Sequence, residues 1–253
     1  MYALERRRQI VALARRDGQV SVVGLAEQLA VAQETIRRDL ADLERQGLLH
    51  RVHGGAFPAE RISFEGDVSV RKDRNPEEKA RIGQRAVAEA EGAEVIYIDE
   101  GSTPAQLARA LNPVQQLTVV TPSIPVVNVF QNHPRVSTFL LGGAVRSRSM
   151  ATTGDWASRM LAELVIDVAF LGTNGFTLSH GLTCPDVQVA AVKRAAIAAA
   201  RRSVLIADSA RFGTDSFVSF GSITDVDTVI TGMAAPRKIV ETLRTRRVQV
   251  FLV

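Results

Sequence analysis

The chain has a single cysteine, Cys184, among its 253 residues, which excludes an internal disulfide. A protein without disulfides fits a reducing compartment, so we expect it in the cytoplasm. The four histidines are scattered without metal-ligand spacing, and we expect no metal ion and no other cofactor. No stretch approaches the roughly 20 consecutive apolar residues that cross a bilayer. We therefore expect no membrane among its partners.

Charge of one sign is also scarce. The formal net charge is +4, and residues 1–58 hold nine arginines against seven acidic residues. Such a small excess permits a polyanionic partner without requiring one. Hydrophobic residues, in contrast, make up 46% of the chain. That is enough for one substantial core and a small second domain.

Three helical patterns of apolar residues fill the first fifty residues. The first spans about residues 4–16, the second starts after Ser21 as its N-cap, and the third begins near Ala32 and ends at Gly47. Only a few residues separate the second pattern from the third, which is typical of a helix-turn-helix. The segment LLHRVHGGA then alternates apolar and polar residues and predicts a two-stranded wing.

The rest of the chain predicts an α/β domain. We expect residues 1–57 to form the winged helix-turn-helix, residues 58–75 a linker, and residues 76–253 the larger domain. Short runs rich in β-branched residues, separated by helical stretches, occupy residues 94–99, 117–121, 136–143, 166–174, 203–208, 227–231 and 248–253. Near-continuous apolar strands that alternate with helices predict a mostly parallel, doubly wound sheet with helices on both faces.

The third helical pattern has one face suited to DNA. If Ile36, Leu40 and Leu43 face the core, Arg37 and Asp39 fall on the two flanks. Residues pointing outward from such a helix can enter the major groove, while phosphate contacts only set its position. Arg38 is the first candidate for a base edge, and Glu34 points outward beside it. The phosphate candidates are Gln33, Thr35 and Arg37, and Arg51 and His53 of the wing are candidates for the DNA backbone or the minor groove. The same face also fits a second interpretation, a solvated ladder of weak ion pairs from Glu34 to Arg38 and from Arg38 to Asp42.

Polar and glycine residues follow the predicted strands of the larger domain. Gly101, Ser102 and Thr103 form a strand-to-helix turn with Pro104 at the first helical position, where free N–H groups favour an anion. Thr103 would equally serve as an ordinary helix cap. Ligands of parallel sheets bind beyond the carboxyl ends of the strands. Further candidates there are Thr121, Ser123, Gly142, Gly143, Arg146, Asn174 and Gly175, although ordinary turns use the same residues.

The segment VAQETIRRDLADLERQGLLHRVHGGA resembles the winged helix-turn-helix of the DeoR family of bacterial transcription regulators. The segments YIDEGSTPAQLARAL, VVTPSIPV, LLGGAVR, DVAFLGTNGF, GLTCPD, AAVKRA and ADSARFG follow in the order of that family's sensor domain. The chain departs from the family at Ala32, where Ser or Thr is usual, and at Pro122, Cys184 and Arg211, where Asn, Thr and Lys are common.

The resemblance implies a sensor fold like ribose-5-phosphate isomerase and a phosphorylated sugar as effector. It implies that Asp99, Gly101, Ser102 and Thr103 hold sugar hydroxyls and phosphate, and that the same pocket is lined by Gly142, Gly143, Asn174, Gly175 and Lys193. The segments MYALERR and GDWA resemble members that govern fructose use, which makes fructose 1-phosphate the specific candidate.

An enzyme of the same fold is the alternative function. Sugar-phosphate isomerisation needs a carboxylate base and a group that polarises the carbonyl. Asp99 and Glu100 are candidates, but a second acid motif like that of the isomerases is missing from the sequence. We therefore expect a repressor of sugar-metabolism genes that a phosphorylated sugar releases from double-stranded operator DNA. Two helix-turn-helix modules one turn of DNA apart require a homodimer or a homotetramer.

Overall fold

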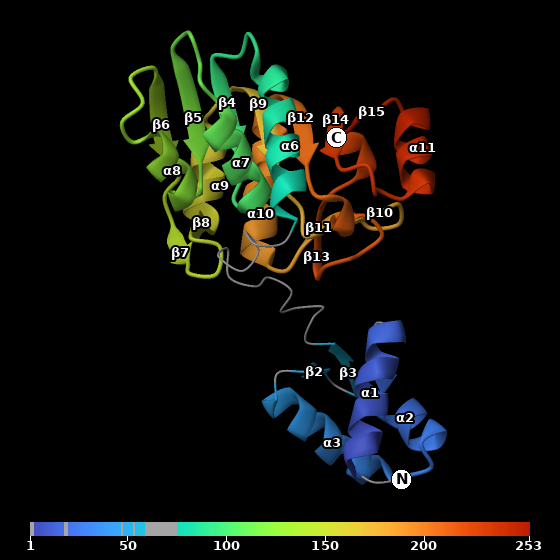
Figure 1. Cartoon of the computed structure of the whole chain (residues 1–253). Coiled ribbons are helices and arrows are strands. Elements are labelled where there is room, and N and C mark those ends of the chain that lie inside the picture. The colour runs from blue at the N-terminus through green and yellow to red at the C-terminus, as the bar shows by residue number, and fades with distance from the viewer. Residues whose placement is uncertain (1–2, 18–19, 47, 53, 59–74) are drawn as a thin grey trace. The chain divides into compact units, whose positions relative to one another are not determined.

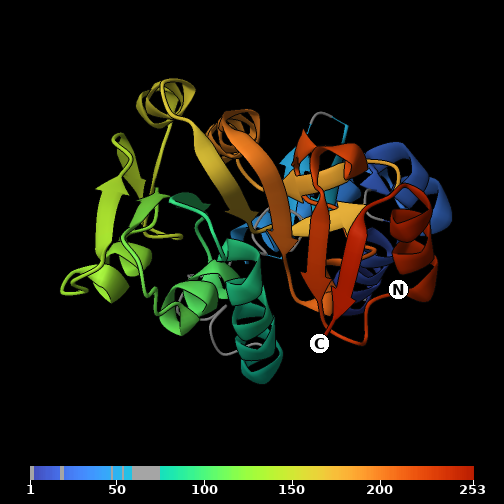
Figure 2. The ribbon, with the colours of Figure 1, turned by 90° about the horizontal axis from the view of Figure 1, so that it is seen from above.

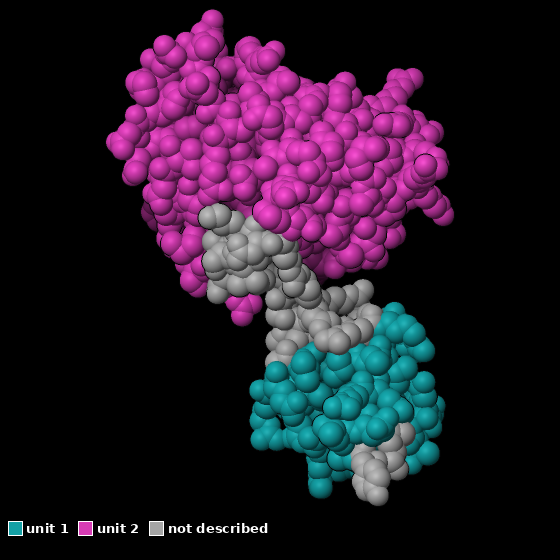
Figure 3. Space-filling model, viewed as in Figure 1, with its two compact units in different colours: residues 1–64 teal, residues 65–253 magenta. Residues whose placement is uncertain are grey.

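The computed structural model describes residues 3–17, 20–46, 48–52, 54–58 and 75–253. It divides into two compact units, residues 1–64 and 65–253 (Figure 3). Of the predicted features, Gly47, His53 and the linker between Pro58 and Asn75 lie outside the described residues. Every helix in this part of the chain is too short or too polar to span a membrane.

The N-terminal unit contains the three predicted helices and the wing. A three-stranded antiparallel sheet, in the order β1-β3-β2, packs with the helices (Figure 1). The elements are α1 (Ala3–Asp17), β1 (Val20–Ser21), α2 (Val22–Gln28), α3 (Gln33–Arg45), β2 (Leu49–Val52) and β3 (Gly55–Pro58). The winged helix-turn-helix is thereby confirmed, with β1 as an additional short strand.

Local sequence explains where these helices start and how they pack. The Ser21 hydroxyl caps α2 by accepting a hydrogen bond from the Gly24 N–H at 3.0 Å. Ala32 precedes α3 and offers no side-chain cap, because a methyl group cannot accept a hydrogen bond. Ile36, Leu40 and Leu43 are buried in one cluster with residues of α1 and α2.

The wing depends on a close approach of two backbones. A Cβ atom at Gly55 would lie 2.2 Å from the carbonyl oxygen of Val20. Only glycine therefore lets β3 pair with β1 in the observed register, Val20 with Ala56 and Ser21 with Gly55.

Asp39 lies on a flank of α3, and the structure shows that this flank is buried. Its carboxylate accepts hydrogen bonds from Arg6 Nε at 2.5 Å and from Arg7 Nε at 2.9 Å. Both arginines belong to α1, and Arg6 is itself nearly buried. This flank of α3 is covered because α1 packs against α3 and its arginine side chains contact Asp39.

The C-terminal unit is built on seven parallel strands in the order β15-β14-β12-β9-β4-β5-β6 (Figure 1). All seven predicted strands are present and the doubly wound α/β fold is confirmed. Their bounds are β4 (Val95–Ile98), β5 (Leu117–Thr121), β6 (Val136–Leu140), β9 (Ile166–Leu171), β12 (Ala200–Ile206), β14 (Thr228–Thr231) and β15 (Gln249–Leu252).

Helices cover both faces of this sheet (Figure 2). One apolar cluster joins the sheet to α6 (Pro76–Ala86), α7 (Ser102–Ala110) and α8 (Ile124–Phe130). A second cluster on the other face includes α9 (Asp155–Ala162), α10 (Val187–Ala199) and α11 (Arg237–Thr245). Short 3-10 turns occupy Val87–Ala90, Ser209–Arg211 and Ile223–Asp225.

Five further strands were not expected from the sequence. A hairpin joins β7 (Ala144–Arg146) to β8 (Ala151–Thr153), and a small sheet has the order β10-β11-β13. Its strands are β10 (Gly175–Thr177), β11 (Gly181–Cys184) and β13 (Val218–Gly221). Strands of three or four residues are too short to show a period of their own.

Substitution Asp39→Ala should loosen the N-terminal unit, because it leaves Arg6 nearly buried without its carboxylate. We expect the opening free energy of the α1 and α3 amides to fall by about 2 kcal/mol. Hydrogen–deuterium exchange of the full chain measures this for each helix. Asp42→Ala is the matched control, since Asp42 is more exposed and should have a smaller effect. Equal protection in Asp39→Ala and the unsubstituted protein would show that the pair contributes nothing.

Candidate functional site

The outer face of α3 presents an arginine to solvent. The Arg38 side chain is 81% exposed, and its Nε lies 3.8 Å from the Glu34 carboxylate. Glu34 also contacts Arg37 at 3.3 Å. Asp42, the second expected partner of Arg38, instead pairs with Arg7 and Arg45. The proposed ion-pair ladder is therefore present only in its first half, and the end of Arg38 can reach an external acceptor.

The remaining candidates for DNA contact differ in their exposure and in the contacts that they make within the protein. Gln33 is exposed and its amide oxygen accepts a hydrogen bond from Arg37 at 3.4 Å, whereas Thr35 is half-buried. In the wing, the Arg51 backbone N–H donates to the Glu44 carboxylate at 3.0 Å, and the Arg51 guanidinium lies 4.0 Å from it. Arg51 is thus held against the end of α3. Whether these residues contact DNA stays a prediction.

A pocket opens in the C-terminal unit where the chain reverses its winding. β4 lies between β5 and β9, and the helices that follow β4 and β9 cover opposite faces of the sheet. This leaves a crevice at the carboxyl ends of the two strands, where open α/β sheets bind ligands. The pocket is lined by residues 100–104, 172–174 and 206–208 together with Lys193 and Arg211.

The turn from β4 into α7 supplies one wall of this pocket. Gly101 has φ +120° and precedes the first helical residue, Ser102, so Pro104 stands third in α7 rather than first. Thr103 is the second helical residue, and the N-cap makes no side-chain hydrogen bond, which rules out the capping role for Thr103. The first N–H groups of a helix lack intrahelical partners and carry partial positive charge. Ser102 and Thr103 place such groups in the pocket wall.

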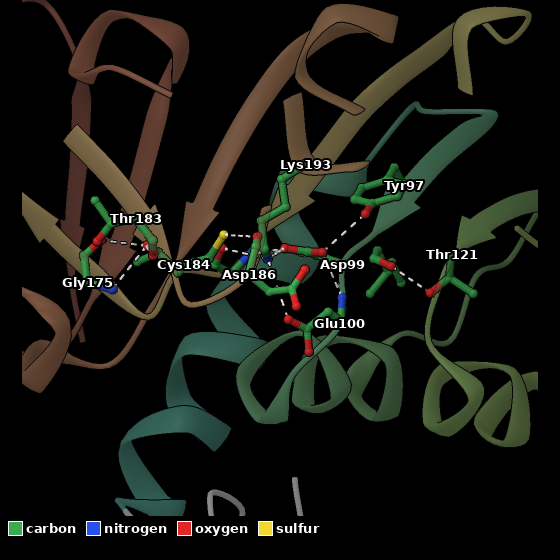
Figure 4. Close-up of polar contacts among 12 residues, drawn as sticks. Tyr97, Asp99, Glu100, Thr121, Gly175, Thr183, Cys184, Asp186 and Lys193 are labelled. Carbon is green, nitrogen blue, oxygen red and sulfur yellow. Dashed lines mark hydrogen bonds and ion pairs between the residues drawn. The ribbon is translucent and has the colours of Figure 1, made fainter. Parts of the chain in front are cut away.

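Asp99 is the centre of a buried polar network beneath the pocket (Figure 4). Its carboxylate accepts hydrogen bonds from Tyr97 Oη at 3.1 Å, from the Glu100 N–H at 2.8 Å and from the Gly172 N–H at 2.9 Å. The ammonium group of Lys193 completes the set with an ion pair to the same carboxylate. Lys193 also donates to the Gly172 carbonyl at 3.1 Å.

Charge and burial determine how this network titrates. Burial alone would lower the pKa of Lys193, but the carboxylates of Asp99 and Glu100 outweigh it, and the pKa is raised. Burial, and then the charge of Asp99, holds the pKa of Tyr97 well above its usual value. Burial also raises the pKa of the nearby Cys184 thiol to about 11. At neutral pH Lys193 is charged, whereas Tyr97 and Cys184 keep their protons.

Of the predicted effector residues, the pocket brings together Gly101, Ser102, Thr103, Asn174 and Lys193. Asp99 lies below it. The others lie outside its lining, and several have structural partners. The Thr121 hydroxyl donates to the Ile98 carbonyl at 2.6 Å, Ser123 caps α8, and Arg146 pairs with Asp186 at 3.5 Å.

Three predicted glycines outside the lining lie close to neighbouring chain. A Cβ atom at Gly143 or Gly175 would lie 2.4 Å from a backbone oxygen, and the Gly142 N–H lies 3.1 Å from Met160 Sδ. A contact of any of these residues with effector stays a prediction.

The sequence did not predict that an acid and an arginine pair with each other in the pocket wall. Asp208 lies two residues beyond the end of β12, and its carboxylate lies 3.4 Å from Arg211 Nε. Glu100, Gly172 and Thr173 also line the pocket. The available signal was their position, since each follows the end of β4, β9 or β12. No group of three His, Cys, Asp or Glu side chains suited to a metal ion occurs among the described residues.

Comparisons with known proteins agree on both units. Residues 6–61 match the family model of the DeoR-like helix-turn-helix domain, and residues 74–233 match that of the DeoR C terminal sensor domain. The HTH-type transcriptional regulator GlpR of Haloferax volcanii is 35% identical over 231 residues, covering 91% of this chain and 90% of that protein. The glycerol-3-phosphate regulon repressor of Escherichia coli is 31% identical over 253 residues, covering 100% of both.

Among solved structures, ribose 5-phosphate isomerase A of Methanocaldococcus jannaschii aligns over 55% of each chain at 16% identity with a TM-score of 0.38. A similarity this low carries no argument about function.

A double-mutant cycle should show that Asp99 and Lys193 stabilise the C-terminal unit as a pair. Asp99→Asn or Lys193→Met alone leaves one buried charge without its main partner, and each should lower the free energy of unfolding by about 3 kcal/mol. The double substitution should recover about 2 kcal/mol of that loss. Urea denaturation at one protein concentration, followed by the fluorescence of Trp156, the only tryptophan, measures all four proteins.

The contribution of Lys193 to the free energy of unfolding should fall at high pH. The pKa of Lys193 is raised on folding, so its contribution is complete below about pH 10.4, the value for a free lysine. It declines as the pH rises through the folded-state value. If the decreases in the free energy of unfolding caused by Asp99→Asn and Lys193→Met simply add up in the double variant, the two residues do not stabilise the unit as a pair.

Proposed function

This chain belongs to the DeoR family of transcriptional regulators, and we propose that it is a repressor that a phosphorylated sugar releases from operator DNA. Its relatives are named as regulators, and the chain is a DNA-binding regulator rather than an enzyme. Under this proposal it acts on chromosomal DNA in the cytoplasm. The observation that carries the proposal is a pocket at the switch point of the sheet whose lining includes the start of α7 and Arg211, in a chain whose helix α3 also exposes Arg38.

The DNA contact rests on the exposed end of Arg38. A guanidinium can donate two hydrogen bonds to O6 and N7 of guanine in the major groove. Arg38 points away from the core formed by Ile36 and Leu40, and its neighbour Ala41 leaves room for the duplex. Arg37 and Gln33 stand beside it and suit phosphate oxygens, which position the helix.

The effector contact rests on two sources of positive charge in the pocket wall. The N-terminus of α7 directs the N–H groups of Ser102 and Thr103 at the pocket, a favourable place for a phosphate. Arg211 is the second source, because Lys193 is committed to Asp99. A phosphate would attract Arg211 away from Asp208, whose carboxylate could then accept hydrogen bonds from sugar hydroxyls. Asn174 and Glu100 offer further acceptors to a polyol.

Two phosphorylated compounds are the first to test. The sequence favours fructose 1-phosphate, and the name of the Escherichia coli relative refers to glycerol 3-phosphate. A compound that binds one state of the regulator about a hundredfold more tightly shifts its equilibrium by about 2.7 kcal/mol. Two charge-assisted hydrogen bonds to phosphate are sufficient for a difference of this size.

Substitution Arg38→Ala should remove operator selectivity and leave general DNA affinity. We expect affinity for the DNA upstream of this gene to fall by about tenfold to a hundredfold, while affinity for unrelated DNA stays the same. Gel-shift titration at fixed salt measures both. Arg45→Ala is the control, because Arg45 is also exposed on α3 but pairs with Asp42 in the last turn. Unchanged selectivity in Arg38→Ala would show that another residue reads the bases.

Substitution Arg211→Ala should weaken the response to the effector without weakening DNA binding. In gel-shifts titrated with fructose 1-phosphate, glycerol 3-phosphate and inorganic phosphate, we expect the concentration for half release to rise at least about tenfold. The control is Arg109→Ala, an exposed arginine at the opposite end of α7. If no phosphorylated compound changes the affinity of the unsubstituted protein for DNA, the chain is a constitutive DNA-binding protein and the proposal fails.

A further inference from the structure

Large apolar side chains gather on the surface at one end of the sheet. On α9, Trp156 is 75% exposed and Met160, one turn later, is 38% exposed. Phe139 of the edge strand β6 is 54% exposed. Residues four apart on a helix share a face, so Trp156 and Met160 point in the same direction. We call Trp156, Met160 and Phe139 the α9 patch.

Two observations place the three side chains on the same face of the C-terminal unit. Met160 Sδ lies 3.1 Å from the backbone nitrogen of Gly142, two residues beyond β6. Phe139 is paired in the sheet with Val120, which is buried in the same cluster as the inner residues of α9. Phe139 therefore points to the face of the sheet that carries α9. It stays exposed on β6, which is the last strand at this edge of the sheet.

At the opposite edge of the same sheet, the aromatic ring of the edge strand is covered. There Phe251 of β15 is covered by the guanidinium of Arg85, which lies 3.6 Å from the centre of its ring. The apolar ring of that edge strand is thus covered within the chain. A cluster containing tryptophan, phenylalanine and methionine is typical of the buried centre of a protein interface.

The charges beside the α9 patch complement their own copy. Asp155 and Arg159 flank Trp156 on α9, are 4.0 Å apart, and are both more than three-quarters exposed. When two copies of α9 pack antiparallel about a two-fold axis that passes at the level of residue 157, residue 155 of one copy faces residue 159 of the other. Each aspartate then lies opposite an arginine of the other copy. The charges of this surface therefore complement a second copy of the same surface, whereas a partner with charge of only one sign would be repelled by one of the two residues.

We propose that a second copy of this chain binds the α9 patch, with α9 packed antiparallel on α9 about a two-fold axis that buries Trp156. The two-fold pairing matches the need for two helix-turn-helix modules on one operator, and to that extent it rests on the proposed function. Asp155 of each copy exchanges its intrahelical contact for Arg159 of the other copy. Phe139 and Met160 close the two ends of the buried apolar strip.

Charge exchange on α9 tests the pairing without altering the core. Asp155→Arg and Arg159→Asp each place like charges opposite one another, and each should raise the dimer dissociation constant at least about tenfold. The double variant Asp155→Arg/Arg159→Asp restores opposite charges and should return it to within about threefold of the starting value. Sedimentation of the full chain over a concentration series measures all four proteins, and circular dichroism checks that each is folded.

Trp156 reports the same contact directly because it is the only tryptophan. We expect its fluorescence to resist acrylamide quenching in the dimer and to become quenchable on dilution and in the two single variants. A monomer at all concentrations, a dimer whose Trp156 is quenched as freely as in the monomer, or a double variant no better than the single ones would each overturn the proposal. Selective operator binding by a dimer with an exposed Trp156 would overturn this interface and leave the proposed function standing.

Discussion

The C-terminal unit is organised around one buried charge, the ammonium group of Lys193. The group comes from α10 and meets Asp99 at the end of β4 and the Gly172 carbonyl just beyond β9. A buried charge is costly unless it is fully paired, so these three segments must stay together. The same requirement shapes the pocket above them. Because Lys193 is already neutralised, an anionic ligand has to rely on the start of α7 and on Arg211.

Sequence patterns were sufficient wherever the determining interaction is local. The seven central strands follow from short β-branched runs, and the helices of the first unit follow from apolar spacing together with a cap such as Ser21. Gly101 and its neighbours were correctly placed after a strand, because a turn into a helix has a clear signature. The helix nevertheless starts two residues earlier than expected, since the positive φ of Gly101 completes the turn by itself.

Contacts between distant parts of the chain could not be predicted from the sequence. The sequence placed Asp39 on a flank of α3, but only the packing of α1 shows that Arg6 covers it. Lys193 was expected in the pocket and lies in its lining, but the sequence did not predict that it pairs with Asp99, which is 94 residues away. The pairing of Asp208 with Arg211 was missed for a simpler reason. The amino-acid sequence of a turn that contains an acid and an arginine does not show whether the turn faces solvent or lines a pocket.

The packing of α9 on α10 connects the two proposed sites of the C-terminal unit. α10 carries Lys193 beneath the pocket, and α9 packs against α10 and contributes Trp156 and Met160 to the α9 patch. Close-packed helices move as bodies rather than deform. If the proposed ligand drew Arg211 away from Asp208, it would bind beside Lys193 of α10, and α10 packs against α9. A change in the pairing of two copies would alter the spacing of their recognition helices, and spacing sets operator affinity. Regulation then needs only that the ligand bind the two pairings with different affinity.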